Sequence, residues 1–190
     1  MKNQWHLSLC LALPLLANSV PSLADGRESY GMDKWAAQPA PGVEPAGNPR
    51  YAASCGSCHF PYQPGLLPAQ SWERLMGDLS KHFGDNAELP PEELNSIRNY
   101  LLNNAAGRTN SAVSAEMLSS LPPGEPPLRI SELPYFVKEH AKVDAQGVKD
   151  NPEIRSFSSC NVCHTRAAEG SYSEGEVHIP TARHKAEKPL

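Results

Sequence analysis

One five-residue pattern, CxxCH, occurs twice in this chain, as CGSCH at 55–59 and as CNVCH at 160–164. In each copy two cysteines are separated by two residues and followed directly by a histidine. This spacing is typical of covalent c-type haem attachment, in which both thiols bond to the haem and the adjacent imidazole binds its iron. The sequence therefore predicts two covalently bound haems c, with attachment at Cys55, Cys58, Cys160 and Cys163 and proximal iron ligands at His59 and His164.

Two other uses of paired cysteines fit the sequence less well. Zinc ribbons keep their CxxC pairs about 15–20 residues apart, whereas Cys58 and Cys160 are far more widely separated. A zinc site also gives no reason for a histidine directly after each pair. A thioredoxin-like dithiol needs a buried strand before it, and no such strand is indicated before either motif.

Residues 1–24 resemble a secretory signal peptide. Lys2 supplies the positive start, residues 7–16 a short apolar run, and residues 22–24 a small-residue cleavage site. The apolar run is too short to span a bilayer. Cys10 lies in the segment that would be removed, so the mature chain would keep only the four motif cysteines. We expect export to the periplasm, where c-type haem is attached in bacteria.

The charge balance bears on possible partners. The formal net charge is −4, which argues against nucleic acid or an anionic membrane surface as the main partner. No segment after the signal peptide is apolar enough to be transmembrane. We therefore expect a soluble mature protein that does not span a membrane.

The prolines mark the expected organisation of the chain. Nineteen prolines are about double the average usage, and they cluster. The stretch 38–49 reads as an irregular lead-in that wraps the first lobe, and 121–127 as an interdomain linker. We expect an N-terminal haem lobe at 25–124 and a C-terminal haem lobe at 125–190, the latter ending in a charged tail at 181–190.

The predicted fold is mainly α with extensive coil, in two small cytochrome c-like lobes with one haem each. Three stretches have helical periodicity: 72–82 with Ser71 as its cap, 90 to about 107 with an apolar stripe of Leu94, Ile97 and Leu101, and a third that starts near 131. Each motif is also expected to open a short helix, the second of which ends near Gly170.

The distal ligand of the first iron is chosen from two residues. His82 shares an apolar helix face with Leu75 and Leu79, so it points toward whatever that helix buries. Met117 is the alternative, because it lies in a Ser- and Pro-flanked stretch that a ligand loop can occupy. We favour His82, since nitrogen is the better ligand for ferric iron; Met76 is expected to pack in the core.

The second iron also has two candidates for its distal ligand. Only 26 residues follow His164, so an upstream ligand is expected. His140 lies on the apolar side of the third helix with Phe136, Val137 and Val143, and we favour it. His178 is the rival because its neighbours are apolar, while His184 lies in the charged tail and is expected to be solvated.

Much of the sequence resembles the bacterial periplasmic dihaem cytochrome c (DHC) family. The likeness is carried by CGSCHFPYQPGLLPAQSW, HFGDNAEL and IRNYLLNNAA in the first half, and by PYFVKEHAKV and CNVCHTRAAEGSYSEGEVHIP in the second. The resemblance implies two low-spin haems with two histidine ligands each, the distal ones matching His82 and His140. It also implies a role as an electron donor associated with a membrane b-type cytochrome and, in some members, an oxygen-binding monohaem cytochrome.

These observations predict a single-electron carrier and no enzyme activity. Six-coordinate iron with two histidines has no vacant position for a substrate, and histidine in place of methionine lowers the reduction potential. One alternative is a dihaem peroxidase-like enzyme in which one iron is open. Another is an electron-transfer subunit of a periplasmic reductase. Carbon monoxide binding by the reduced protein distinguishes the enzyme from the carrier.

Overall fold

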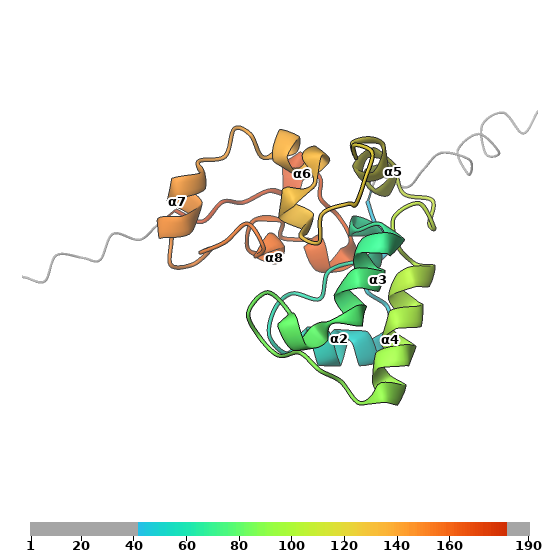
Figure 1. The fold of residues 1–190 in the computed structure, drawn as a ribbon. Coiled ribbons are helices and arrows are strands. Elements are labelled where there is room, and N and C mark those ends of the chain that lie inside the picture. Colours follow the sequence, from blue (N-terminus) through green and yellow to red (C-terminus); the bar gives the residue numbers. More distant parts are fainter. Residues whose placement is uncertain (1–41, 182–190) are drawn as a thin grey trace, which may run out of the picture. The chain divides into compact units, whose positions relative to one another are not determined.

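The computed structural model describes residues 42–181. The predicted signal peptide and nearly all of the charged tail lie outside these residues. The described part is helical with long coil and has only three isolated β-bridges, which confirms the predicted fold class. Its α-helices (Figure 1) are α2 (Pro49–Cys55), α3 (Ala69–Gly77), α4 (Pro91–Asn103), α5 (Ala112–Ser119), α6 (Pro134–Glu139), α7 (Ala145–Asp150) and α8 (Cys160–Cys163). No helix among these residues has the length and apolar character needed to cross a membrane.

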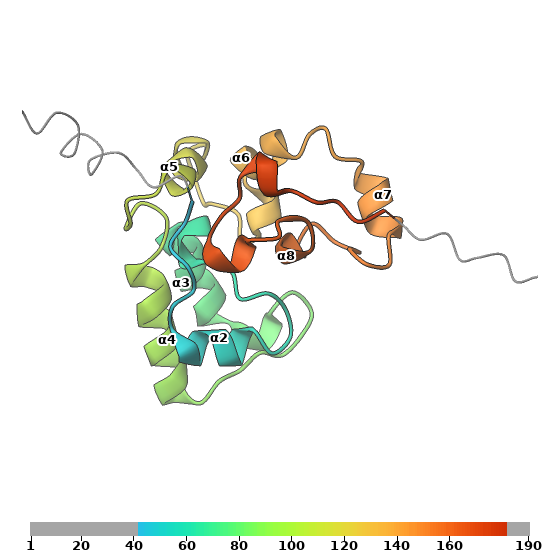
Figure 2. The same ribbon diagram turned by 180° about the vertical axis from the view of Figure 1, so that it is seen from behind.

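Helix α4 organises the first half of the described chain. It begins at Pro91, where the missing N–H costs nothing, and carries Glu92 and Glu93 in its first turn, where acidic groups favour the helix dipole. Ile97 and Leu101 of its predicted apolar stripe are fully buried. Helices α2 and α3 both pack against α4 (Figures 1 and 2).

The predicted helix at 72–82 is wrong at both ends. Helix α3 starts at Ala69, and Ser71 does not cap it; the Ser71 hydroxyl donates instead to the carbonyl of Pro127 at 2.7 Å. The helix ends at Gly77, because Asp78 adopts φ −146° and ψ 63°, outside the helical region. A 3₁₀ turn at Leu79–Lys81 follows, so His82 lies in a loop and not on the helix face.

The helices at the two motifs also differ from the prediction that each motif opens a short helix. The first motif ends a helix, since α2 runs from Pro49 to Cys55. The second opens α8 as expected, but α8 ends at Cys163. Gly170, with φ +80°, ends the next 3₁₀ turn, Ala167–Glu169. Sequence analysis missed α5 and α7, although Ser111 and Asp144 cap their first turns with side-chain oxygens.

One hydrophobic cluster contains buried residues from both sides of the proline-rich stretch 121–127, such as Ile97 before it and Phe136 after it. The stretch is held against α3, where Arg74 donates to the carbonyl of Pro126 at 3.0 Å and lies 3.3 Å from the Glu125 carboxylate. The division into two haem lobes at this stretch stays a prediction.

The lead-in contacts the end of the described chain as well as its first half. The Val43 N–H donates to the Gly170 carbonyl at 2.9 Å, and the Ser111 hydroxyl donates to the Gly42 carbonyl at 2.7 Å. A Cβ on Gly170 would lie 1.8 Å from the Val43 oxygen, so only glycine permits this approach. Residues 42 and 43 of the lead-in therefore contact Ser111 in the predicted first lobe and Gly170 in the predicted second lobe.

Candidate haem-binding sites

The first site comprises Cys55, Cys58, His59 and His82. The histidine rings lie nearly parallel, with centroids 6.1 Å apart and planes at 13°. The Cys58 and His59 side chains are exposed and Cys55 is half-buried. The structure thus brings the predicted proximal and distal ligands of the first iron close together at the surface, with their ring planes nearly parallel.

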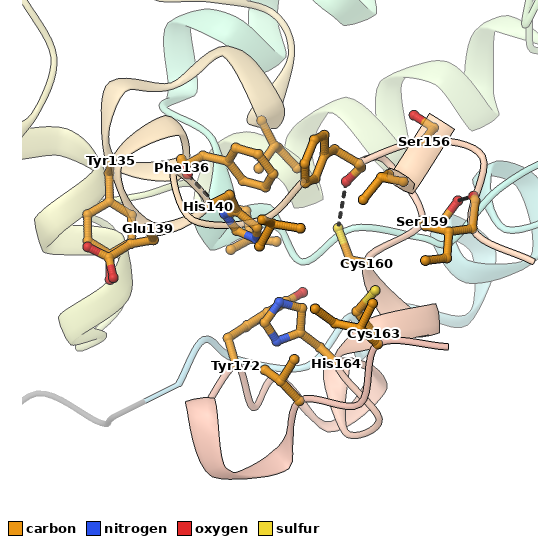
Figure 3. A pocket seen from close by; sticks show the side chains of 18 of the residues that line it. Tyr135, Phe136, Glu139, His140, Ser156, Ser159, Cys160, Cys163, His164 and Tyr172 are labelled. Atoms are coloured by element: carbon orange, nitrogen blue, oxygen red, sulfur yellow. Dashed lines mark hydrogen bonds between the residues drawn. The ribbon is translucent and has the colours of Figure 1, made fainter. Parts of the chain in front are cut away.

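The second site comprises Cys160, Cys163, His164 and His140. The two rings lie on opposite sides of an apolar cavity of about 210 Å³ (Figure 3), with centroids 6.0 Å apart and planes at 68°. Both cysteines line the same cavity. Apolar side chains from α5, α6, α7 and the C-terminal coil complete its wall, among them Met117, Phe136, Val148 and Ile179.

The spacing of both ring pairs fits an iron ion between them. An imidazole nitrogen binds a transition metal at about 2 Å and lies roughly 1 Å from its ring centre, so two rings on one iron have centroids about 6 Å apart. The observed separations are 6.1 Å and 6.0 Å. The residues present therefore fit the group that each motif is built to hold.

Hydrogen bonding differs among the four histidines that are predicted as iron ligands. Nδ1 of His59 lies 2.8 Å from the Phe60 carbonyl, and Nδ1 of His140 lies 2.9 Å from the Phe136 carbonyl. A carbonyl can only accept, so each Nδ1 carries the proton and leaves Nε2 free for a metal. Nδ1 of His82 and of His164 is buried and has no hydrogen-bond partner within residues 42–181.

Burial shifts the pKa of several site residues toward the neutral form. It lowers the pKa of His82, with the nearby His59 as the next cause, and it lowers the pKa of His164, where His140 is the next cause. Neutral imidazole is the form that binds iron. Burial also raises the pKa of the Cys55 and Cys160 thiols to about 11 in each case. A thioether carries no charge, so this environment suits covalent attachment and disfavours a thiolate.

The alternative ligands lie elsewhere. Met117 is buried on α5 and lines the cavity of the second site, so it is not in the ligand loop considered for the first iron. His178 is exposed; Val177 and Ile179 line the cavity, whereas the His178 side chain does not. No group of three or more His, Cys, Asp or Glu in the described part of the chain is placed to hold a metal ion.

Sequence analysis missed most of the aromatic residues that pack against the predicted ligands. Phe136 stacks on His140 with centroids 3.8 Å apart, and Phe157 meets the same ring edge-on at 5.8 Å. Tyr62 stacks on His59 at 5.1 Å, and Tyr172 lies 5.2 Å from His164. Only Phe136 was placed near its ligand by helical spacing; the others come from coil, where no periodicity indicates a direction.

Comparison with known proteins decides the family. The sequence profile described as "Dihaem cytochrome c" matches residues 51–172. The chain belongs to the dihaem cytochrome c family. This confirms the predicted family and means that the protein carries two covalently attached c-type haems.

Solved structures agree with the family. A diheme cytochrome c from Rhodobacter sphaeroides is 37% identical and has a TM-score of 0.61, over 68% of this chain and 100% of that one. A diheme cytochrome c from Shewanella baltica OS155 is 36% identical and has a TM-score of 0.57, over 70% of this chain and 93% of that one. No match was found among curated proteins. The roles of individual residues in this dihaem cytochrome c stay predictions.

Proposed function

We propose that this dihaem cytochrome c is a single-electron carrier in which each iron is bound by two histidines. His59 and His82 would hold the first iron, and His164 and His140 the second, while the four motif cysteines hold the haems covalently. The observation that carries this proposal is the spacing of the two imidazole rings at each site, whose centroids are 6.1 Å apart at the first site and 6.0 Å apart at the second. When bound, each haem supplies one-electron chemistry at its iron.

Both sites would then be closed to substrates. A peroxidase needs one iron with an open position, whereas the proposed ligation would place each iron between two histidines. His140 is held on its side by a hydrogen bond and by Phe136 stacked on its ring. These contacts support a carrier over the peroxidase-like alternative.

The two motifs are also linked by direct contacts. Tyr62 stacks on His59, and its hydroxyl donates at 2.7 Å to the carbonyl of Ser158, two residues before Cys160. Electron transfer within one molecule requires such closeness of the two attachment segments. This contact supports a relay in which both haems serve one electron pathway.

The compartment and the partners belong to the same proposal. A signal peptide at residues 1–24 would deliver the chain to the periplasm, the compartment in which c-type haem is attached. There it would receive electrons from a quinol-linked membrane b-type cytochrome and pass them to a periplasmic redox protein, such as an oxygen-binding monohaem cytochrome. An electron-transfer subunit of a periplasmic reductase would use the same chemistry with another partner, and co-purification distinguishes the two.

Absorbance and electron paramagnetic resonance (EPR) spectra of the purified holoprotein test the closed sites. We expect both haems to be low-spin in the oxidised and reduced states, a low reduction potential, and no rapid carbon monoxide binding by the reduced protein. Rapid stoichiometric binding at either haem would contradict the carrier. Full reduction at mildly positive potential would contradict the double histidine ligation.

A further inference from the structure

Among residues 42–181, no hydrogen bond to Nδ1 fixes the orientation of the His164 ring. His59 and His140 are each fixed by an Nδ1 hydrogen bond to a backbone carbonyl. His164 Nδ1 is buried and has no such partner among residues 42–181. A ligand without a hydrogen bond on its free nitrogen is oriented only by the groups that pack around it.

Tyr172 is the aromatic residue that packs against His164 from the side of its own coil. The ring centroids are 5.2 Å apart at an angle of 61°, and Tyr172 and His164 lie on the same wall of the second cavity (Figure 3). The Tyr172 hydroxyl is available as a hydrogen-bond donor.

The acceptor for this hydroxyl comes from the other motif. The Tyr172 hydroxyl donates at 2.5 Å to Oε1 of Gln63, a residue only four positions after His59. Gln63 is fully buried, with 0% exposure. A buried amide is stable only when both of its ends are hydrogen-bonded, so its two partners fix its position.

The second partner of Gln63 also adjoins His164. The Nε2 group of Gln63 donates to the Ala167 carbonyl, and the Ala167 N–H donates to the His164 carbonyl at 2.9 Å. Ala167 is itself fully buried. One side chain thus holds both the turn that follows His164 and the tyrosine that packs on its ring.

We propose that Gln63 is a positioning residue for the second haem: through Tyr172 and Ala167 it sets the ring orientation of His164, although it lies in the loop of the first motif. The inference rests on the ligation proposed above. The ring orientation of an axial imidazole controls the splitting of the iron d orbitals, so it is read directly by the EPR spectrum of a ferric haem.

The test is made on the native holoprotein and four variants. EPR spectra are recorded in the oxidised state, and the reduction potential of each haem is measured. Gln63→Leu removes both hydrogen bonds at similar volume, and Tyr172→Phe removes only one while keeping the ring. Tyr51→Phe is the matched control, because it deletes a buried tyrosine hydroxyl that donates at 2.6 Å to the Tyr62 carbonyl. His140→Ala identifies the second haem as the one whose low-spin signal is lost.

We expect Gln63→Leu to shift the largest g value and the potential of the second haem, Tyr172→Phe to shift them in the same direction by less, and Tyr51→Phe to leave them unchanged. The first haem, nearer in sequence to Gln63, should keep its signal in all three. An unchanged second-haem signal in Tyr172→Phe and Gln63→Leu, or equal shifts at both haems, would overturn the inference.

Failure of the ligation itself has a different result. If His140→Ala leaves both haems low-spin, the proposed ligand is wrong and the spectra no longer report on His164 as assumed. If Gln63→Leu yields no folded holoprotein, Tyr172→Phe alone decides, because it changes a single oxygen atom and keeps the ring packing. A second-haem shift in that variant supports the proposal, and its absence refutes it.

Discussion

The two candidate haem sites each comprise two cysteines and two histidines but hold them in different ways. At the first site the rings are nearly parallel and the proximal histidine is exposed; at the second they are steeply inclined at 68° and line an apolar cavity. His82 lies in a loop between a 3₁₀ turn and Phe83, a non-glycine residue with φ +55°. His140 caps α6 and is held by Phe136 through a hydrogen bond and ring stacking. The same CxxCH motif therefore lies at the surface in the first site and beside an interior cavity in the second.

The largest effect should come from preventing haem attachment at each site in turn. Replacing Cys160 and Cys163 by alanine should remove one haem and leave the apolar wall of the second cavity facing water. The Cys55 and Cys58 double variant should also lose one haem but expose less apolar surface. We expect the thermal midpoint to be about 10 °C or more lower in the former than in the latter. Intact mass and thermal unfolding measure this, and equal midpoints would contradict the distinction between interior and surface sites.

Removing each distal ligand should open one iron. His82→Ala and His140→Ala should each convert one haem to high-spin and let the reduced protein bind one equivalent of carbon monoxide. His140→Ala should also cost about 1–3 kcal/mol more in unfolding free energy, because it deletes the contacts with Phe136 and Phe157. Carbon monoxide titration and chemical denaturation give the two values. A variant that keeps both haems low-spin would rule out that residue as a ligand.

The native oxidised protein should give two different low-spin EPR signals in equal amounts. Two parallel imidazole planes separate the energies of the iron dxz and dyz orbitals more than two inclined planes do. The site with planes at 68° should therefore have the larger maximum g value, and the site with planes at 13° the smaller. His140→Ala should remove the former and His82→Ala the latter. Two identical signals would show that the ring orientations do not differ.

The smallest effect is expected for Met117→Leu. Met117 packs against the second site, so an apolar side chain of similar volume should cost about 1 kcal/mol or less. Both haems should remain low-spin, and no near-infrared thioether band should be present in either protein. Loss of such a band, or of low-spin character, would make Met117 a ligand.

The sequence predicted the parts of the sites that local spacing controls. The CxxCH motifs, the stripe of Ile97 and Leu101 in α4, and Phe136 four residues before His140 all follow from short-range periodicity. His82 was chosen for a helix face that it does not occupy, because Asp78 leaves the helical region and no local pattern predicts that break. Gln63 and Tyr172 meet across more than a hundred residues, which no periodicity can indicate.

The contact between Val43 and Gly170 has a consequence for the order of folding. Their hydrogen bond joins segments near the two ends of the described residues, 42–181, so it closes a very long loop and carries a large closure entropy. We expect this bond to form after the segments between its ends, because their folding shortens the effective loop that it closes. The lead-in would then lock the C-terminal coil last, once the second motif has folded around its haem, and the chain would remain open to attachment until that step.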